Sequence, residues 1–192
     1  MAIGSLVRIL IIRICSLFYF KNRSKVIFYH DIHSKKKYTN MSTAIELFAN
    51  HIQIIRESGY EVVPEITKEY GQIEICFDDA FLGLYENIGF LKQQNIPVHL
   101  FVISSYLERE NYINEKQLME LSKLDIIKIS SHTHTHKILN QLDENELLRE
   151  LKESKEILED LLNAPVDSIC YPEGKFDKKT IDIAKKVGYK KQ

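Results

Sequence analysis

The sequence lacks the features that mark several large classes of protein. Its three cysteines lie far apart and form no CxxC pair, which argues against a disulfide framework or a zinc site built from thiolates. Lysine and arginine total 26 against 27 aspartate and glutamate, so there is no overall positive charge to attract nucleic acid. The Asn-Gly turns of β-hairpins, internal repeats and low-complexity linkers are also missing. With 192 residues, 44% of them apolar, we expect one domain that binds no nucleic acid.

The first 22 residues contain a strongly apolar stretch. In MAIGSLVRILIIRICSLFYF the apolar residues recur at helical spacing, and Arg8 and Arg13 lie off that face. Arg13 interrupts the apolar core and no small-x-small cleavage site follows, which argues against a cleaved signal peptide. Two arginines inside a spanning helix would each cost about 2.5–3.5 kcal/mol. We therefore expect residues 1–22 to form an amphipathic helix on a membrane surface.

Two alternatives for this segment remain, a signal anchor that spans the membrane and a helix that packs on its own domain. The basic residues that follow it favour the membrane surface, because they can meet anionic head groups. The sequence does not say whether the domain faces the cell envelope or the cytoplasm. Membrane association is the expected location.

Short β-branched runs alternate with longer helical patterns from residue 25 to residue 192. This βαβα order predicts a mainly parallel sheet, open or closed into a barrel, with helices outside. A further strand would be expected after the last helix, so a barrel of this kind would lack its last segment. We predict strands at 25–30, 72–77, 98–104, 126–130 and 168–171, and helices at 42–58, 82–94, 114–123, 143–162 and 178–187.

Polar residues follow four of the five predicted strands. The strings HDIH, DDA, SHTHTH and PEG come at the ends of the first, second, fourth and fifth strands. The carboxyl ends of parallel strands meet at one rim, which is where barrels and open α/β sheets place their chemistry. We therefore expect these strings to form one site.

Two of these strings contain metal ligands. His132 and His136 are four residues apart at a strand end, so both imidazoles can reach one ion if the chain turns after the first, while His134 points elsewhere. Of the adjacent Asp78 and Asp79, one can bind the ion while the other accepts a proton from water. Two histidines and one aspartate leave an open coordination position, as a hydrolytic zinc ion requires. We predict one divalent metal ion, zinc; an aspartate pair that only caps the next helix is the alternative.

Other rim residues have weaker support. His30, next to Asp31, can serve as a proton donor, although a histidine at the edge of the core is nearly as good an interpretation. In the string YPEG, the backbone NH of Glu173 can face a developing oxyanion, and an ordinary Pro-Gly turn is the alternative. No local motif supports Cys170 as a nucleophile. Three histidines are expected to have no role: His33, His51 and His99.

The order of these motifs resembles that of a known family. The stretches FDDA, YENIGFLKQQNIPVHLFV, ISSHTHTHKILNQL and CYPEGKFD are similar to successive motifs of the polysaccharide deacetylases, carbohydrate esterase family four, over about residues 26–189. The resemblance implies a deformed (β/α) barrel and a metal-dependent hydrolase that removes acetyl groups from N-acetylated sugars or polysaccharides. The Tyr-His pair at 29–30 is similar to the start of a branch with rearranged motifs that includes poly-N-acetylglucosamine deacetylases.

The resemblance also implies a role for each matching position. Asp79 takes the position of the metal-binding aspartate, with His132 and His136 as the two histidine ligands. Asp78 takes the position of the catalytic base, and His30 takes that of the acid in the branch with the early Tyr-His pair. The motif that binds the oxyanion falls on three residues of the YPEG turn: Tyr171, Pro172 and Glu173.

Three positions depart from the family pattern. The glycine usual after the aspartate pair is Ala80, and the arginine that many members place two residues before the motif proline is Cys170. The chain ends at Gln192, before the region where other members carry a final strand and their own acid histidine. A chain that relied on that later histidine would be inactive as it stands.

Two other functions are compatible with the motifs. A truncated, non-catalytic domain can bind an N-acetylated glycan and retain the metal without releasing acetate. Two histidines and a carboxylate are also the ligands of non-haem iron oxygenases. That chemistry usually belongs to a double-stranded jelly roll, whereas this sequence reads βα throughout.

Overall fold

The computed structural model describes residues 22–191. The helix expected at 1–22 lies, apart from its last residue, outside the described residues and stays a prediction. Within residues 22–191, none of the helices combines the length and the apolar character needed to cross a membrane. The first strand begins at Lys25, and Arg23 already forms an isolated bridge with Tyr70, so the domain boundary expected at residue 25 stays a prediction.

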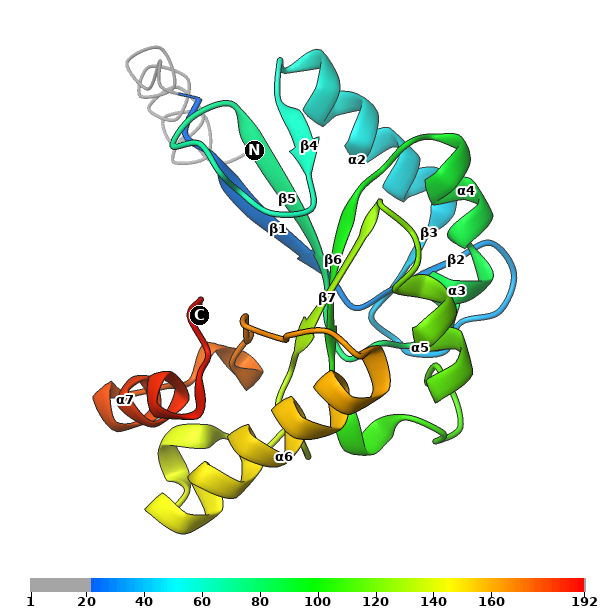
Figure 1. Cartoon of the computed structure of the whole chain (residues 1–192). Coiled ribbons are helices and arrows are strands. Elements are labelled where there is room, and N and C mark those ends of the chain that lie inside the picture. The colour runs from blue at the N-terminus through cyan, green and yellow to red at the C-terminus, as the bar shows by residue number, and fades with distance from the viewer. Residues whose placement is uncertain (1–21, 192) are drawn as a thin grey trace, which may run out of the picture.

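A parallel sheet runs through the centre of the molecule (Figure 1). Its strands follow the order β1 (Lys25–Tyr29), β5 (Gln72–Phe77), β6 (Val98–Val102) and β7 (Ile127–Ser131). Each of these pairings is parallel, and the short strand β4 (Glu61–Val63) pairs in parallel with the first half of β5. Beyond β7, isolated bridges join Ser131 to Ile169 and Ser168 to Lys191. The predicted α/β class with a mainly parallel sheet is confirmed.

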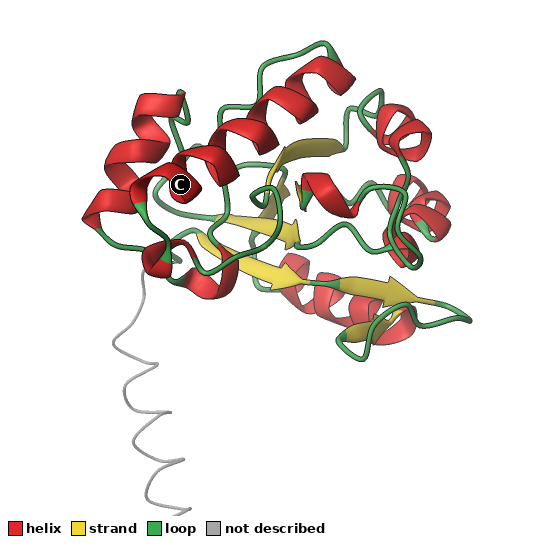
Figure 2. Cartoon of the chain, turned by 90° about the horizontal axis from the view of Figure 1, so that it is seen from below, coloured by secondary structure: helices red, strands yellow, loops and turns green. Residues whose placement is uncertain are grey.

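Helices surround the sheet, as the view from below shows (Figure 2). Two further short strands, β2 (Asp31–His33) and β3 (Ser42–Ala44), form a separate parallel pair. Three 3-10 turns, η1 (Ser104–Tyr106), η2 (Leu139–Gln141) and η3 (Pro172–Gly174), lie in the connections. The helices are α2 (Ile45–Glu57), α3 (Leu82–Glu86), α4 (Ile88–Gln93), α5 (Glu115–Leu121), α6 (Glu144–Leu162) and α7 (Lys178–Val187).

The helices that match their predicted bounds begin at local capping residues. The side chain of Asp143 accepts a hydrogen bond from the N–H of Glu146 at the start of α6. Asp177 forms a capping box with Thr180 at the start of α7. Asn114 does the same for α5. These signals lie within three residues of one another in the sequence, which is why the sequence alone locates these helix starts.

Three predicted elements differ from the structure for tertiary reasons. The helix predicted at 42–58 begins only at Ile45, because Ser42–Ala44 pairs with β2. The helix predicted at 82–94 is split at Asn87, whose side-chain amide donates hydrogen bonds to the backbone oxygens of Gly83 at 2.8 Å and Ile32 at 3.3 Å. The strand predicted at 168–171 consists only of isolated bridges.

The two faces of β5 differ in chemistry. Ile73, Ile75 and Phe77 belong to the buried apolar core. Glu74 and Cys76 alternate with them and line a cavity on the other face, together with Asp78 just after the strand. Because successive side chains on a strand point to opposite faces, a run that reads as a buried strand here carries a row of polar groups on its inner face.

Strand β1 forms one edge of this sheet. Its inward-facing side chains Val26 and Phe28 are 56% and 64% exposed and line the cavity, so the cavity is open on this side. Among residues 22–191, no pairing joins β1 to the segment 168–191. Closure into a complete barrel therefore stays a prediction.

Candidate active site

A cavity of about 800 Å³ lies on the inner face of the sheet. Its walls come from β1, β5 and β6, the loop after β7, and the segment 168–176. The polar strings at the strand ends thus converge, as the parallel topology predicts. Six of the predicted site residues line it: His30, Asp78, His132, His136, Tyr171 and Glu173.

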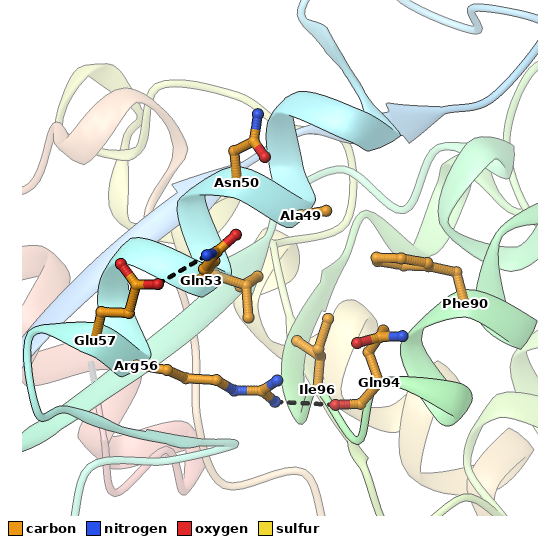
Figure 3. Close-up of a pocket in the computed structure, with 9 residues that line it drawn as sticks. Ala49, Asn50, Gln53, Arg56, Glu57, Phe90, Gln94 and Ile96 are labelled. Atoms are coloured by element: carbon orange, nitrogen blue, oxygen red, sulfur yellow. Dashed lines mark hydrogen bonds between the residues drawn. The ribbon is translucent and has the colours of Figure 1, made fainter.

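A second hollow, of about 420 Å³, lies on the outside of the sheet between α2 and α4 (Figure 3). Gln53 donates a hydrogen bond to Glu57 at 2.7 Å, and Arg56 donates one to the backbone oxygen of Gln94 at 2.9 Å. The residues that line this groove include neither histidine nor cysteine. Its charged side chains, Arg56 and Glu57, are both hydrogen-bonded, so the groove offers no cluster of free charged groups for catalysis.

Three residues converge at the carboxyl end of the strands, and we call Asp79, His132 and His136 the rim cluster. Oδ1 of Asp79 lies 3.5 Å from Nε2 of His132 and 3.5 Å from Nε2 of His136. This carboxylate oxygen is buried and has no hydrogen-bond partner. A buried oxygen left without a partner is costly, and two imidazole nitrogens already face it. The three residues therefore fit a divalent cation, and their ligand atoms lie within 4.8 Å of one another.

His132 is oriented as a metal ligand. Its Nδ1 donates a hydrogen bond to the backbone oxygen of Cys170 at 2.9 Å, which leaves Nε2 to face Asp79. Burial lowers the pKa of His132 to about 4, and the positive charges of His136 and His30 lower it further against the backbone hydrogen bond. The ring is therefore neutral at pH 7. A neutral imidazole whose second nitrogen donates to a carbonyl is the usual form of a histidine that binds metal.

The loop that carries both histidines turns sharply after His132, as expected. Thr133 and His136 have positive φ angles of 68° and 62°, and the Thr133 hydroxyl accepts the N–H of His136 at 3.1 Å. Glu150 on α6 accepts the N–H of Thr135 at 2.7 Å and its hydroxyl as well. The Glu150 side chain is buried. This positioning residue was not predicted, because on a helix rich in charges it resembles a solvated glutamate.

Asp78, the other acid of the pair, lies beside the rim cluster and lines the cavity. Its N–H donates to the backbone oxygen of Tyr29 at 2.9 Å, and its Oδ1 is buried without a hydrogen-bond partner. Burial raises the pKa of Asp78 to about 7, and the neighbouring charge of Asp79 adds to the increase. A carboxylate of this kind can take up and release a proton near neutral pH.

The backbone at this turn is strained and closely packed. Asp79 and Ala80 have positive φ angles of 71° and 63°, a region in which a residue with a Cβ is uncommon. Ala80 occupies the position where the resemblance expects a glycine. Three residues later, a Cβ on Gly83 would lie 2.3 Å from Oδ1 of Asp31 and 2.3 Å from the backbone oxygen of Ile32. Only glycine fits there, and this close contact packs α3 against β2.

The remaining predicted residues differ in their positions. His30 lines the cavity; its charge lowers the pKa of His132 and offsets part of the increase that burial causes in the pKa of Asp79. Tyr171 also lines the cavity, and its buried hydroxyl has no hydrogen-bond partner. Glu173 has a positive φ of 55° in η3, and its carboxylate is paired with Lys175 at 2.6 Å. Pro172, between these two residues, is buried and does not line the cavity.

Two neighbouring residues stand outside the rim cluster. His134 points away, as predicted, since its Nδ1 lies 2.8 Å from the hydroxyl of Ser104 and its Nε2 lies 3.4 Å from Glu153. The sulfur of Cys170 lies within 4.8 Å of ligand atoms of Asp78 and His132. Burial raises the pKa of the Cys170 thiol, which is unfavourable for a nucleophilic thiolate.

A second polar group lines the same cavity, and the sequence analysis assigned it no role. Glu74 and Cys76 lie on β5, four and two residues before Asp78, and His99 lies opposite Cys76 on β6. We call Glu74, Cys76 and His99 the floor cluster. Nδ1 of His99 lies 2.7 Å from Oε1 of Glu74, and Nε2 lies 2.7 Å from the hydroxyl of Ser130. The sequence did not indicate this cluster, because Glu74 and His99 are 25 residues apart and all three residues lie in runs that look apolar.

Comparison with protein families and curated proteins gives a consistent result. The family model described as polysaccharide deacetylase matches residues 66–191. The putative polysaccharide deacetylase YxkH of Bacillus subtilis is 25% identical over 175 residues, which are 85% of this chain and 61% of that protein. The poly-beta-1,6-N-acetyl-D-glucosamine N-deacetylase of Staphylococcus aureus is 28% identical over 130 residues, 60% of this chain and 45% of that protein. The chain thus spans about half to three fifths of the length of these relatives.

Solved structures show similarity in fold. The Streptococcus pyogenes deacetylase PplD, in complex with acetate, superposes with a TM-score of 0.75 at 23% identity over 88% of this chain and 82% of that one. IcaB from Ammonifex degensii superposes with a TM-score of 0.77 at 19% identity, with the same shares covered. At these identities the similarity concerns the fold alone.

Proposed function

Because this chain belongs to the polysaccharide deacetylase family, we propose that it is a metal-dependent hydrolase that removes N-acetyl groups from a sugar or polysaccharide of the N-acetylglucosamine type and releases acetate. The observation that carries this proposal is the buried, unpartnered Oδ1 of Asp79, which two imidazole nitrogens face at 3.5 Å. The Staphylococcus aureus relative supports the choice of sugar by its name.

The rim cluster would hold the metal. Two imidazoles and one carboxylate suit zinc, and three protein ligands leave a coordination position for water or substrate. A zinc ion bound there supplies a positive charge that polarises the acetamide carbonyl and makes a bound water more acidic. His132 is fixed for this task by its hydrogen bond to the Cys170 carbonyl.

The residues around the rim cluster divide the proton transfers between them. Asp78 accepts a proton from the attacking water, because its buried carboxylate has a pKa near neutrality and lines the same cavity. His30, which follows the neighbouring strand β1 and lines the same cavity, donates a proton to the leaving sugar amine. The turn of Tyr171, Pro172 and Glu173 faces the carbonyl oxygen as charge develops on it, with the backbone of Glu173 as the donor.

Metal content and acetate release from the same variants test this function. We expect Asp79→Ala and His132→Ala to lose the metal at the rim and all acetate release from N-acetylglucosamine oligomers. Asp78→Asn should retain the metal and lose turnover by about 10²–10⁴-fold, the usual contribution of a general base. His134→Ala is the matched control, because it removes a histidine of the same motif that points away, and it should retain both. An active Asp78→Asn protein would contradict the mechanism.

Two other functions are distinguished by the same assay. Sugar binding by the purified chain without acetate release would favour a non-catalytic binding domain. An iron- and oxygen-dependent activity would favour an oxygenase, but the named strands pair only in parallel, unlike those of a jelly roll.

We also propose that residues 1–22 place the enzyme on a membrane surface. The apolar face of this segment and the basic residues beyond it support the proposal. The full chain should co-sediment with vesicles that contain anionic phospholipid, and less so at high salt. Failure to bind such vesicles at low salt would contradict it.

A further inference from the structure

The floor cluster brings together three types of metal ligand. A carboxylate oxygen of Glu74, the sulfur of Cys76 and a ring nitrogen of His99 all lie within 4.8 Å of one another. All three side chains are buried, and all three line the cavity, so a cation can reach them from it. A site made of a thiolate, an imidazole and a carboxylate favours zinc over harder ions such as magnesium or calcium.

The atoms that do not converge already have partners. Oε2 of Glu74 accepts the N–H of Ile66 at 3.1 Å, and Nε2 of His99 lies 2.7 Å from the hydroxyl of Ser130. Oε1, Nδ1 and the sulfur of Cys76 are turned toward one another, because Nδ1 of His99 donates to Oε1 at 2.7 Å and the thiol of Cys76 donates to it at 3.6 Å. An ion bound here would take the place of these two hydrogens. Bonds of this kind behind a ligand fix its orientation, and they usually accompany metal sites in proteins.

Charge balance is also favourable. Oε2 of Glu74 accepts the N–H of Ile66 and Oε1 faces the ring of His99, so the pair offers one carboxylate and one imidazole. Burial raises the pKa of the Cys76 thiol, so the ion itself would have to displace the proton of this sulfur. One carboxylate and one thiolate would then neutralise a divalent ion. Binding would release one proton, from the Cys76 sulfur, while the ring proton of His99 moves to Nε2 and points at Ser130.

From this arrangement we propose that Glu74, Cys76 and His99 form a second zinc site, separate from the rim cluster. Its consequence is mechanical. β5 and β6 are joined by only two residue pairs, Cys76 with His99 and Phe77 with Leu100, because β4 occupies the first half of the same edge of β5. β6 and β7 share five pairs. An ion held by two residues of β5 and one of β6 ties the sheet together where its own hydrogen bonds are fewest.

Cobalt titration of the metal-free full chain tests this site, because a cobalt ion bound by a thiolate gives a charge-transfer band in the near ultraviolet. We expect two equivalents of Co²⁺ to bind and this band to appear. Cys76→Ser should lose the band and one equivalent. Cys170→Ser, which removes the thiol beside the rim cluster, should retain both, as should Cys15→Ser. A band that persists in Cys76→Ser, or a wild-type protein that binds one equivalent without a band, would overturn the proposal.

A second measurement covers the case in which Cys76→Ser fails to fold. X-ray absorption of the double variant Asp79→Ala/Cys170→Ser loaded with zinc examines the floor cluster, since this protein lacks the rim aspartate and also the thiol that lies near Asp78 and His132. A sulfur neighbour at about 2.3 Å supports the second site, and only nitrogen and oxygen neighbours contradict it. The same variant separates this proposal from the proposed hydrolase, because loss of acetate release there leaves the floor site occupied.

Zinc bound at the floor should also raise the melting temperature. Any ligand that binds only the folded state stabilises it in proportion to the logarithm of its concentration above Kd. In the Asp79→Ala background, added zinc should raise Tm by several degrees, and the additional change His99→Gln should abolish that increase. An equal increase in both proteins would contradict the assignment of His99.

Discussion

The rim cluster and the floor cluster both combine a carboxylate with imidazole, but they differ in how they are held. The rim lies in loops with positive φ angles at Asp79, Ala80, Thr133 and His136, and Oδ1 of Asp79 has no hydrogen-bond partner. The floor lies on regular strands, and its carboxylate and imidazole are hydrogen-bonded. The difference indicates that the rim is locally destabilising, with uncommon backbone angles and an unpaired carboxylate oxygen that is available for a ligand. At the floor the hydrogen-bonded polar groups contribute to stability.

The acids of the two regions should therefore respond oppositely to pH, whereas the buried rings of His132 and His99 both have lowered pKa values and both favour neutral over acid pH. Burial raises the pKa of Asp78 and of Asp79 at the rim, so the folded chain favours their protonated forms. At the floor, hydrogen bonds hold the pKa of Glu74 low against burial, so the folded chain favours its charged form. In metal-free protein, ionisation of Asp78 and Asp79 at alkaline pH should lower the free energy of unfolding. Protonation of Glu74 at acid pH should lower it as well.

The largest effect on stability is expected at Gly83, where α3 packs against β2 just after the Asp78–Asp79 turn. Gly83→Ala places a Cβ 2.3 Å from both Asp31 Oδ1 and the backbone oxygen of Ile32, and should lower the free energy of unfolding by more than about 3 kcal/mol. Gly89→Ala is the matched control, because a Cβ on this glycine of α4 meets nothing within 4 Å and should be neutral or raise stability by up to about 1 kcal/mol. Urea unfolding measures both. Equal stability of the two variants would show that the rim does not depend on this contact.

A smaller effect of opposite sign is expected from Asp78→Asn in the metal-free protein. The pKa of Asp78 is raised to about 7 in the folded chain, so wild-type stability falls as pH rises from about 4 to about 7. The asparagine cannot ionise, so the variant should exceed wild type by about 2 kcal/mol at pH 8 and match it near pH 4. Thermal unfolding in the presence of a chelator at both pH values measures the difference. If the variant were less stable than wild type at pH 8, the ionised Asp78 side chain would not be unfavourable in the folded chain.

The smallest effect is expected from Glu74→Gln at the floor. The pKa of Glu74 is held low, so its contribution is present above its unfolded pKa and is lost as pH falls through the folded value. The variant should lose about 1–2 kcal/mol at pH 7 in metal-free protein, since charged hydrogen bonds become neutral ones. The deficit should shrink as pH falls below the unfolded pKa of about 4.3. A deficit that grows in acid would mean that the floor behaves like the rim.

Many helices and strands could be predicted from short stretches of the sequence. Asp143 and Asp177 cap α6 and α7 through residues three positions away, and the β-branched runs at 25–29 and 72–77 form strands as predicted. The short strands β2, β3 and β4 were not predicted, because three residues are too few to show a period. The break at Asn87 was missed because it depends on a backbone oxygen 55 residues earlier in the chain.

The candidate site divides in the same way. The sequence indicated Asp79, His132 and His136 as a set, and the structure places their ligand atoms within reach of one ion. It did not indicate Glu150, whose role depends on α6 lying against the histidine loop. Nor did it indicate His99, which was expected to have no role and instead lies 2.7 Å from Glu74. Roles of this kind come from pairings between strands, which no short motif records.

The sequence by itself determined the order of strands and helices, the polar strings at the strand ends and the family to which the chain belongs. Tertiary structure alone decided which face of β5 turns to the cavity, how His132 is aimed and that Glu74, Cys76 and His99 meet. The physical reason is distance along the chain. Caps and periodic patterns act over three or four residues, whereas the bonds that orient these groups join residues 25 and 38 positions apart.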